Sequence, residues 1–190
     1  MNKEEYVNNY FTEISNVFNE IKTLTPKIVE ISSVCVKALK NQNKIMFCGN
    51  GGSASQCQHL TAEFLLKYSF NRNPLNIISL TADSSVLTTA SNDFGYESVF
   101  SKQLEGIGQK GDVIIGLSTS GNSKNVLKAF EVAKEKSITT IAFSGKDGGE
   151  MSKISDYCLV VPSKSGSHIQ ECHLAIGHLL CDLVEKELFS

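Results

Sequence analysis

The sequence lacks tryptophan, long apolar runs and a strong excess of either charge. Its 190 residues include only 3 prolines, and 20 acidic side chains against 18 basic ones leave a net charge of −2. Such a balanced charge gives no electrostatic reason to expect a nucleic-acid or acidic-membrane partner. No apolar run approaches the roughly 20 residues that cross a bilayer, and the start MNKEEYVNNY has no apolar signal-peptide segment. We therefore expect a cytoplasmic protein.

No two cysteines have the C-x-x-C spacing of metal and redox motifs. Most of the 6 cysteines stand inside apolar segments, where a thiol serves as a small core residue. We expect all of them to be reduced and structural, since a cytoplasmic protein seldom carries disulfides. They are Cys35, Cys48, Cys57, Cys158, Cys172 and Cys181.

The pattern of apolar residues changes once along the chain. Residues 3–40 carry apolar positions at helical spacing, and Pro26 divides them into two helices. Beyond them come five short apolar runs separated by helical patterns, at residues 44–48, 76–80, 112–118, 139–144 and 157–162. This alternation predicts an α/β fold, a three-layer α-β-α sandwich around a five-stranded parallel sheet. With no linker or repeat in view, residues 1–190 are expected to form one domain.

Two of the runs are followed by segments rich in glycine and serine. GNGGS follows the first run at residues 49–53, and STSGNS follows the third at residues 118–123. Ligands of open α/β sheets lie beyond the carboxyl ends of the strands. Exposed backbone N–H groups, hydroxyls and a helix N-terminus together favour a phosphate. Glycine and serine are also ordinary turn and N-cap residues, but two such loops at neighbouring strand ends favour an anion site.

A dinucleotide site is the alternative for the first loop. Gly49, Gly51 and Ala54 formally satisfy the strand-to-helix fingerprint, which expects an acidic residue about 20 positions later. No acidic residue lies between Glu63 and Asp83, so the fingerprint is incomplete, although Asp83 keeps this alternative open. A P-loop is excluded because no Gly-Lys-Ser/Thr follows the glycines.

Titratable side chains follow the first loop at helical spacing. His59, Glu63 and Lys67 are spaced i, i+4 and i+8, which places them on one helix face. A solvated face with an internal ion pair is the ordinary interpretation of such a triplet. Its position close behind the glycine loop also allows His59 and Glu63 to face the bound anion.

The last helical segment holds three of the four histidines. His178 can share a helix face with Gln170 or Glu171, whereas His173 points about 140° away from His178. A lone histidine in an apolar helix is more often a core or interface residue. Two histidines with carboxylate and amide oxygens could also hold Zn²⁺, Ni²⁺ or Mn²⁺. Spacing alone leaves both interpretations open.

Five segments form a recognisable combination. They read CGNGGSASQCQHLTAEF, ASNDFGYESVFSKQLE, GDVIIGLSTSGNSKNVLKAF, GKDGGEM and HIQECHLAIGHLLCDLVEKEL. Together they resemble the phosphosugar isomerase (SIS) domain, and within it the sedoheptulose 7-phosphate isomerases of heptose biosynthesis. The resemblance implies conversion of D-sedoheptulose 7-phosphate to D-glycero-D-manno-heptose 7-phosphate, the first step towards the activated heptose of lipopolysaccharide core or capsule. It also implies a homotetramer with zinc-containing active sites between subunits.

Matching positions carry the family's roles onto this sequence. Glu63 and His178 match the catalytic pair, and the metal-ligand positions are His59, Glu63, Gln170 and His178. The substrate-binding positions are Gly51, Gly52, Ser53, Glu63, Asn92, Asp93, Ser118, Thr119, Ser120, Ser123 and Gln170. An aldose–ketose interconversion needs a base for carbon, a proton donor for oxygen and an electrophile, which a carboxylate, an imidazole and a metal would supply.

A non-enzymatic SIS module is the alternative function. Phosphosugar sensors and the tetrameric adaptor that binds the bacterial replication initiator resemble this chain in the glycine and serine loops. The resemblance implies that those modules lack the glutamate and the last-helix histidine, whereas Glu63 and His178 are both present here. The enzyme is therefore the favoured interpretation. The apolar helices at residues 1–42 and at the C-terminus exceed what one small core can cover, so we expect them to pack against partner subunits.

Overall fold

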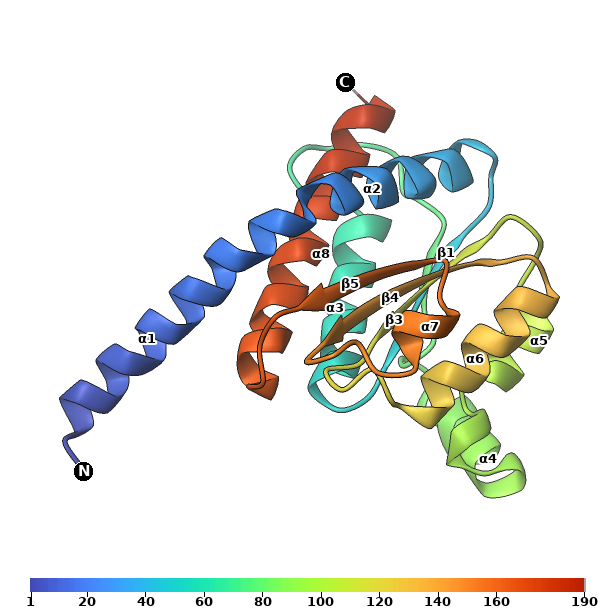
Figure 1. Cartoon of the computed structure of the whole chain (residues 1–190). Helices are drawn as coiled ribbons and strands as arrows, with labels where there is room; N and C mark the ends of the chain where they lie inside the picture. Colours follow the sequence, from blue (N-terminus) through green and yellow to red (C-terminus); the bar gives the residue numbers. More distant parts are fainter. Residues whose placement is uncertain (190) are drawn as a thin grey trace.

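The computed structural model describes residues 1–189, which form a three-layer α-β-α structure (Figure 1). The strands are β1 Ile45–Gly49, β2 Ile77–Ser79, β3 Val113–Leu117, β4 Thr139–Gly145 and β5 Tyr157–Val161. All of them are parallel, in the order β2-β1-β3-β4-β5. The helices are α1 Lys3–Glu20, α2 Thr25–Lys40, α3 Gly52–Leu65, α4 Ser84–Phe94, α5 Ser101–Ile107, α6 Lys124–Glu135, α7 Met151–Ile154 and α8 Gly166–Phe189. Single turns of 3₁₀-helix, η1 Ile21–Leu24 and η2 Tyr96–Ser98, complete the chain.

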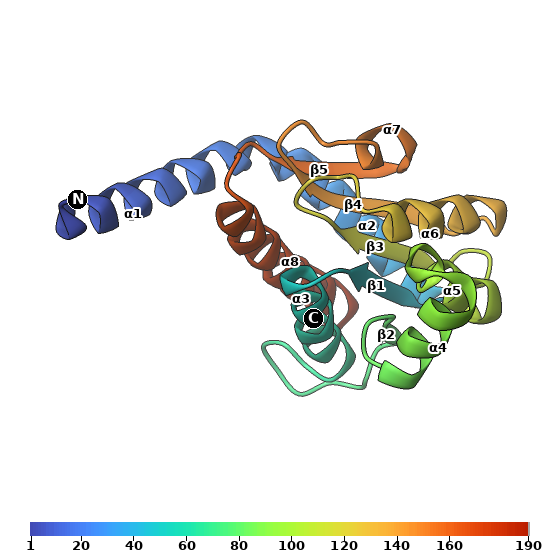
Figure 2. The ribbon, with the colours of Figure 1, turned by 90° about the horizontal axis from the view of Figure 1, so that it is seen from below.

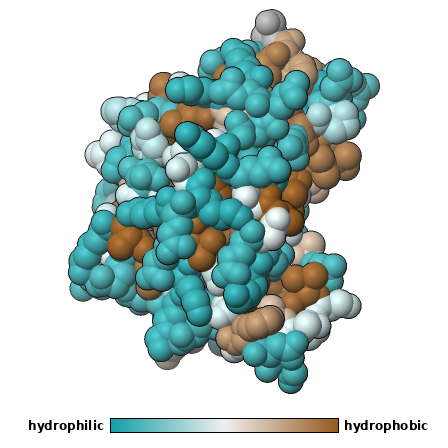
Figure 3. Space-filling view, turned by 90° about the vertical axis from the view of Figure 1, so that its right-hand side faces the viewer, coloured by the Kyte–Doolittle hydropathy of each residue, from teal (hydrophilic) through white to brown (hydrophobic). Residues whose placement is uncertain are grey.

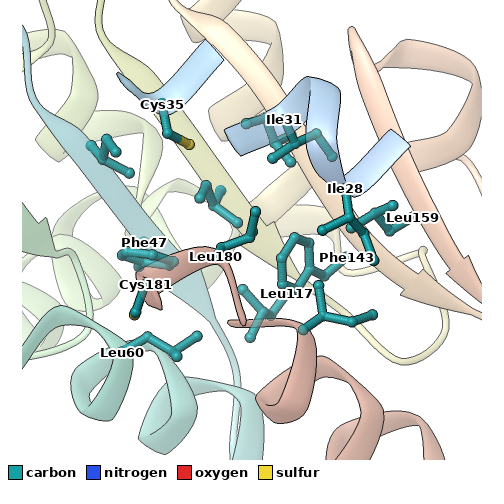
Figure 4. Packing of buried hydrophobic residues seen from close by; sticks show 14 of the residues in the cluster. Ile28, Ile31, Cys35, Phe47, Leu60, Leu117, Phe143, Leu159, Leu180 and Cys181 are labelled. Atoms are coloured by element: carbon teal, nitrogen blue, oxygen red, sulfur yellow. The ribbon is translucent and has the colours of Figure 1, made fainter. Parts of the chain in front are cut away.

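The predicted sheet is confirmed, with no strand end shifted by more than one residue. Its central strands β1 and β3 are buried at every position because helices cover both faces. Side chains alternate between the faces, so Phe47 and Ile115 pack towards α2, α3 and α8, while Met46 and Ile114 pack towards α5 and α6. Figure 4 shows the first of these cores, where side chains from three helices meet the strands.

The N-terminal helices are divided where the sequence predicts. Pro26 stands in the first turn of α2, a position that tolerates the missing N–H, and η1 joins the two helices. Helix α2 buries Ile28, Ile31 and Cys35 against the sheet and α8. Helix α1 instead extends away from the body of the protein (Figures 1 and 2) and buries only Val17. Helix α2 therefore belongs to the core along its length, whereas α1 contributes only Val17 to it.

The cysteines behave as small core residues. All six are free thiols, and five are buried. Burial raises the pKa of Cys35 to about 12 and that of Cys172 to about 11. Thiols with such pKa values are not nucleophilic at neutral pH. Among residues 1–189, no helix is both long and apolar enough to cross a membrane.

A buried ion pair ties the amino ends of β1 and β3 together. Lys44 Nζ lies 2.6 Å from Asp112 Oδ2, with the two side chains 10% and 1% exposed. Asp112 also accepts hydrogen bonds from the backbone of Lys44 and Gln109.

Figure 3 views the side of the molecule that lies on the right in Figure 1, and its surface is mostly hydrophilic with separate apolar areas.

Replacing Gly116 in the middle of β3 tests the packing of the sheet. A methyl group there would lie 2.6 Å from Val126 Cγ1 and 2.9 Å from the ring of Phe130. We expect Gly116→Ala to lower the free energy of unfolding by about 1–3 kcal/mol through overpacking. Gly106→Ala, on α5 with open space around it, is the matched control and should change stability by less than about 1 kcal/mol. Equal effects of the two variants in urea denaturation would contradict this packing.

Candidate active site

The two glycine- and serine-rich loops emerge side by side at the carboxyl edge of the sheet. Gly49 and Leu117, the last residues of β1 and β3, are register partners. The strand order 2-1-3-4-5 reverses direction between these two strands, and ligands of such folds bind at this point. Gly51 has a φ of +55°, a conformation that favours glycine, and initiates α3.

Hydroxyl groups gather in the second loop. Ser118 Oγ lies 2.8 Å from Ser123 Oγ and 3.5 Å from Ser120 Oγ. The loop is supported from behind, since Met151 N donates to Gly121 O and Glu150 N donates to Asn122 Oδ1. Helix α6 begins directly after it, so free N–H groups and hydroxyls face the same edge as the start of α3. This arrangement suits a phosphate.

Two asparagines link the loops, a connection that sequence reasoning missed. The Asn50 and Asn125 side-chain amides donate to each other at 2.9 and 2.8 Å. The Tyr96 hydroxyl donates to Asn50 Oδ1 at 2.7 Å. Asn125 is only 3% exposed, so this bond satisfies a buried amide. Asn50 is recognisable as a loop residue, but nothing in the sequence pairs it with residues 46 and 75 positions away.

Helices α3 and α8 run side by side in the same direction (Figures 1 and 2). Their contacts pair Gly52 with Gln170 and Leu60 with Gly177. A methyl group on Gly177 would lie 2.5 Å from Leu60 Cδ2, so glycine permits this close approach. The neighbouring positions, His59 and His178, are consequently brought face to face.

His59, Glu63 and His178 form the titratable cluster of the site. The two histidine Nε2 atoms lie 2.8 Å apart, with ring centroids separated by 5.1 Å. Glu63 Oε1 is 3.8 Å from His59 Nε2, and the two side chains are 29% and 46% exposed. Tyr68 stacks on His178 at 5.9 Å with an interplanar angle of 30°. The cluster thus combines a carboxylate and two imidazoles that solvent or a ligand can reach.

Gln170 lies apart from this cluster, beside the first loop. A methyl group on Gly52 would be 2.9 Å from Gln170 Oε1, and the Gln170 carbonyl accepts a 2.6 Å hydrogen bond from Gln56. Gln170 and His178 are eight residues apart on α8, about 12 Å along the helix axis. Within one chain the structure therefore places three of the four expected metal-ligand residues together and the fourth beside the first loop.

Other expected residues have different positions. Lys67 donates to Asn71 and not to Glu63, so the predicted row on α3 stops at Glu63. Asn92 and Asp93 are exposed on α4 and hydrogen-bond to each other at 2.7 Å. Asp83, which kept the dinucleotide alternative open, is the N-cap of α4 and accepts from Val86 N.

The remaining histidines are structural. His173 is fully buried and its Nε2 lies 3.0 Å from the Ser144 carbonyl, to which it donates. Burial lowers the pKa of His173 to about 4, although this hydrogen bond acts in the opposite direction. His168 is also buried, with the Tyr10 ring of α1 packed edge-on against it.

Two imidazoles and a carboxylate are the donors that the cluster offers to a metal ion. Within the described residues, no group of three or more His, Cys, Asp or Glu side chains is arranged to hold one. His59 and His178 nevertheless turn the same nitrogen towards a common point, beside the Glu63 carboxylate. Imidazole nitrogen and carboxylate oxygen are ligands that zinc accepts. The residues therefore fit zinc by their chemistry. Because the two imidazoles contact each other in this structure, holding the ion would require them to rearrange or a further ligand to join them.

The family model described as SIS domain matches residues 9–145. Together with the fold and the two loops, this match defines the class of this protein. A phosphoheptose isomerase of Akkermansia muciniphila is 47% identical over 98% of both chains, and that of Sulfurimonas denitrificans is 51% identical over 94% of this chain and 91% of its own. Two solved structures of phosphoheptose isomerases superpose closely. The one from Neisseria gonorrhoeae has a TM-score of 0.90 at 37% identity, covering 96% of this chain and 98% of its own. The one from Francisella tularensis has a TM-score of 0.94 at 33% identity, covering 98% and 100%.

The chain therefore belongs to the SIS domain family, and within it to the phosphoheptose isomerases. The fold expected from the resemblance is confirmed.

The low pKa of His173 makes stability depend on pH. The unfolded state binds a proton near pH 6.5 and the folded state only near pH 4, so stability falls as the pH decreases between these values. We expect His173 to account for a loss of about 2 kcal/mol between pH 7.5 and 5. In His173→Gln, urea denaturation should show a correspondingly smaller loss. The other histidines remain in both proteins and cancel in the difference. An identical pH dependence would contradict the buried neutral imidazole.

Proposed function

We propose that this chain interconverts D-sedoheptulose 7-phosphate and D-glycero-D-manno-heptose 7-phosphate. The observation that carries the proposal is the meeting of Glu63 with His178 and His59 across α3 and α8, on a scaffold whose strand ends present two anion-binding loops. The names and near-complete coverage of the relatives support the same reaction. The product would lead towards nucleotide-activated heptose for lipopolysaccharide core or capsule. A cytoplasmic location stays a prediction from the sequence.

The reaction moves one hydrogen between C1 and C2 through an enediol. Glu63 is the carbon-directed base: it takes the proton from C1 of the ketose and returns it to C2. His178 donates a proton to O2 as the enediol forms and accepts the proton of O1 as the aldehyde forms. For this purpose His178 exchanges its contact with His59 for one with the sugar oxygens. Both groups are accessible enough to reach a substrate, as their contacts lie at the surface.

The phosphate is assigned to the two loops. Backbone N–H groups at the start of α3 and hydroxyls of the second loop would surround its oxygens. The residues are Gly51, Gly52, Ser53, Ser118, Thr119, Ser120 and Ser123. Sugar hydroxyls are assigned to Asn92, Asp93 and Gln170, whose side chains offer both donors and acceptors.

One zinc ion per subunit is part of the proposal. His59, Glu63, Gln170 and His178 would hold it, and when bound it would polarise the sugar oxygens and stabilise the enediolate. A carboxylate that ligates a metal is a weaker base, so Glu63 would serve carbon best when its metal contact is loose.

We propose that each active site lies between subunits of a homotetramer. Gln170 stands at the phosphate loop, about 12 Å along α8 from His178. Glu63 lies ten residues, or about 15 Å, beyond Ser53 on α3. The separation of Gln170 from His178 within one chain supports a site that takes the loops and Gln170 from one chain and Glu63 with His178 from another.

Apolar side chains on α1 support this assembly. Tyr6 is 60% and Phe11 62% exposed, and Val7 and Phe18 lie exposed on the same helix. Such a surface on a projecting helix is typical of subunit interfaces. Within residues 1–42 it is therefore α1 that is proposed to serve oligomerisation, because α2 packs on the sheet and on α8 of its own chain.

The second candidate function is a non-catalytic module that binds phosphosugars or the replication initiator. The loops alone would serve it. The presence of both Glu63 and His178, facing the same contact region, favours the enzyme.

Removing either proton-transfer group tests the reaction. We expect Glu63→Gln and His178→Gln to lower kcat on sedoheptulose 7-phosphate by about two or more orders of magnitude. Glu131→Gln, an exposed change on α6, is the control and should keep full activity. Turnover is measured in a coupled assay after checks of folding and zinc content. A folded, zinc-supplied wild-type protein that binds phosphosugars without turnover would support the module instead.

Complementation tests the shared site. Ser120→Asp repels the phosphate and Glu63→Gln removes the base, so each variant alone should be inactive. Co-expressed as mixed oligomers, the two variants should recover about a quarter of wild-type activity, because one random site in four takes an intact half from each chain. A mixture as inactive as its components would show that each chain carries a whole site.

A further inference from the structure

The loop that follows α3 contains an arginine with every N–H group engaged. Arg72 donates through Nη1 and Nη2 to the carbonyls of residues 63, 64, 65 and 66, at 2.7–3.3 Å. Nη1 also donates to the Asn73 carbonyl. These are the carbonyls that a helix end leaves without partners. Arg72 therefore closes the C-terminal turn of α3, the turn that carries Glu63.

A single carboxylate on α8 holds this arginine. Glu185 Oε1 accepts from Arg72 Nε at 2.8 Å, and the two side chains are 1% and 2% exposed. The same carboxylate accepts from the backbone N–H groups of Tyr68 at 2.8 Å and Ser69 at 2.6 Å. Burial raises the pKa of Glu185, but the two backbone bonds and the arginine outweigh it, so the pKa is lowered overall. Glu185 is thus ionised and fully bonded.

We call the buried ion pair of Arg72 and Glu185 the clamp. The clamp is also connected to His178, the second proposed proton-transfer group. Glu185 lies seven residues after His178, two turns further along the same face of α8. Tyr68, whose N–H it binds, stacks on the His178 ring. One buried ion pair is consequently connected to the backbone of Glu63 on one side and to the imidazole of His178 on the other.

We infer that Arg72, Glu185 and Tyr68 are positioning residues that set the relative placement of Glu63 and His178. This inference deepens the proposed isomerase function and rests on it for the kinetic readout. Groups behind catalytic and metal-binding residues typically contribute 10- to 100-fold to activity or metal affinity. Small displacements of reacting groups have similar consequences.

The test compares changes in the clamp with a change in an equally buried ion pair elsewhere. Arg72→Lys loses the planar guanidinium fork and most of its six hydrogen bonds, Glu185→Gln loses the charge, and Tyr68→Leu loses the stacked ring. Tyr68→Phe keeps the ring and serves as the conservative variant. Lys44→Met breaks the buried pair with Asp112 between the starts of β1 and β3 and controls for general loss of stability.

Three quantities are measured on each full-length protein: kcat and KM on sedoheptulose 7-phosphate, Zn²⁺ affinity by competition with a chromophoric chelator, and the ring resonances of ¹⁵N-labelled histidine. We expect Arg72→Lys, Glu185→Gln and Tyr68→Leu to lower kcat by about tenfold or more with KM within about threefold. Zn²⁺ affinity should fall by about tenfold, and the His178 resonances should shift while those of His173 stay in place. Tyr68→Phe and Lys44→Met should retain kcat, although Lys44→Met lowers the melting temperature.

Two results would overturn the inference. One is a drop in kcat for Lys44→Met as large as that for the clamp variants at equal loss of melting temperature. The other is an unchanged His178 spectrum in Tyr68→Leu, which removes a partly exposed side chain and leaves the ion pair intact. A wild-type protein without turnover would refute the isomerase function but not the clamp, because the histidine spectra report on positioning without substrate or metal.

Discussion

The close approach of α8 to α3 at Gly177 is the contact on which the candidate site depends. Both helices also pack on the same face of the sheet, but only the absence of a side chain at Gly177 lets Leu60 come against the α8 backbone. The residues beside this pair, His59 and His178, meet as a result. Because the helices run in the same direction, each step along α3 has a counterpart on α8. Loop, titratable cluster and ion pair thus follow one another along a single seam.

The two ends of α3 have different chemistry for one reason, the direction of the helix. Its N-terminus presents free N–H groups at the carboxyl edge of the sheet, where Ser53 lies buried in the first turn. Its C-terminus presents free carbonyls, and these are bound by the guanidinium of Arg72. A positive side chain at this end also interacts favourably with the negative end of the helix dipole.

The strands, the loops and the candidate site residues were recognisable in the sequence because each is a local pattern. Val, Ile and Phe runs ending in glycine or serine locate the strand ends, and the i, i+4 spacing locates His59 and Glu63 on one face. The family resemblance added His178 and Gln170. What spacing could not provide was the register of α3 against α8, which separates Gln170 from His178 in one chain. Arg72 and Asn125 were missed for the same reason: an arginine in a polar loop and an asparagine in a helix start are ordinary until their distant partners are known.

The side chains along the contact between α3 and α8 differ in solvent exposure: those of the titratable cluster are partly exposed, and those of the ion pair are buried. His59 and Glu63 keep 46% and 29% of their side chains exposed, and a 2.8 Å contact between two imidazoles requires one ring to donate and the other to accept. Such a contact is readily exchanged for a ligand, since each nitrogen can find an equivalent partner in water or in a sugar hydroxyl. Arg72 and Glu185, at 2% and 1%, have no such freedom, because breaking a buried ion pair leaves an uncompensated charge at a cost of roughly 3–5 kcal/mol. The reactive groups can therefore change partners while the backbone that carries them stays fixed.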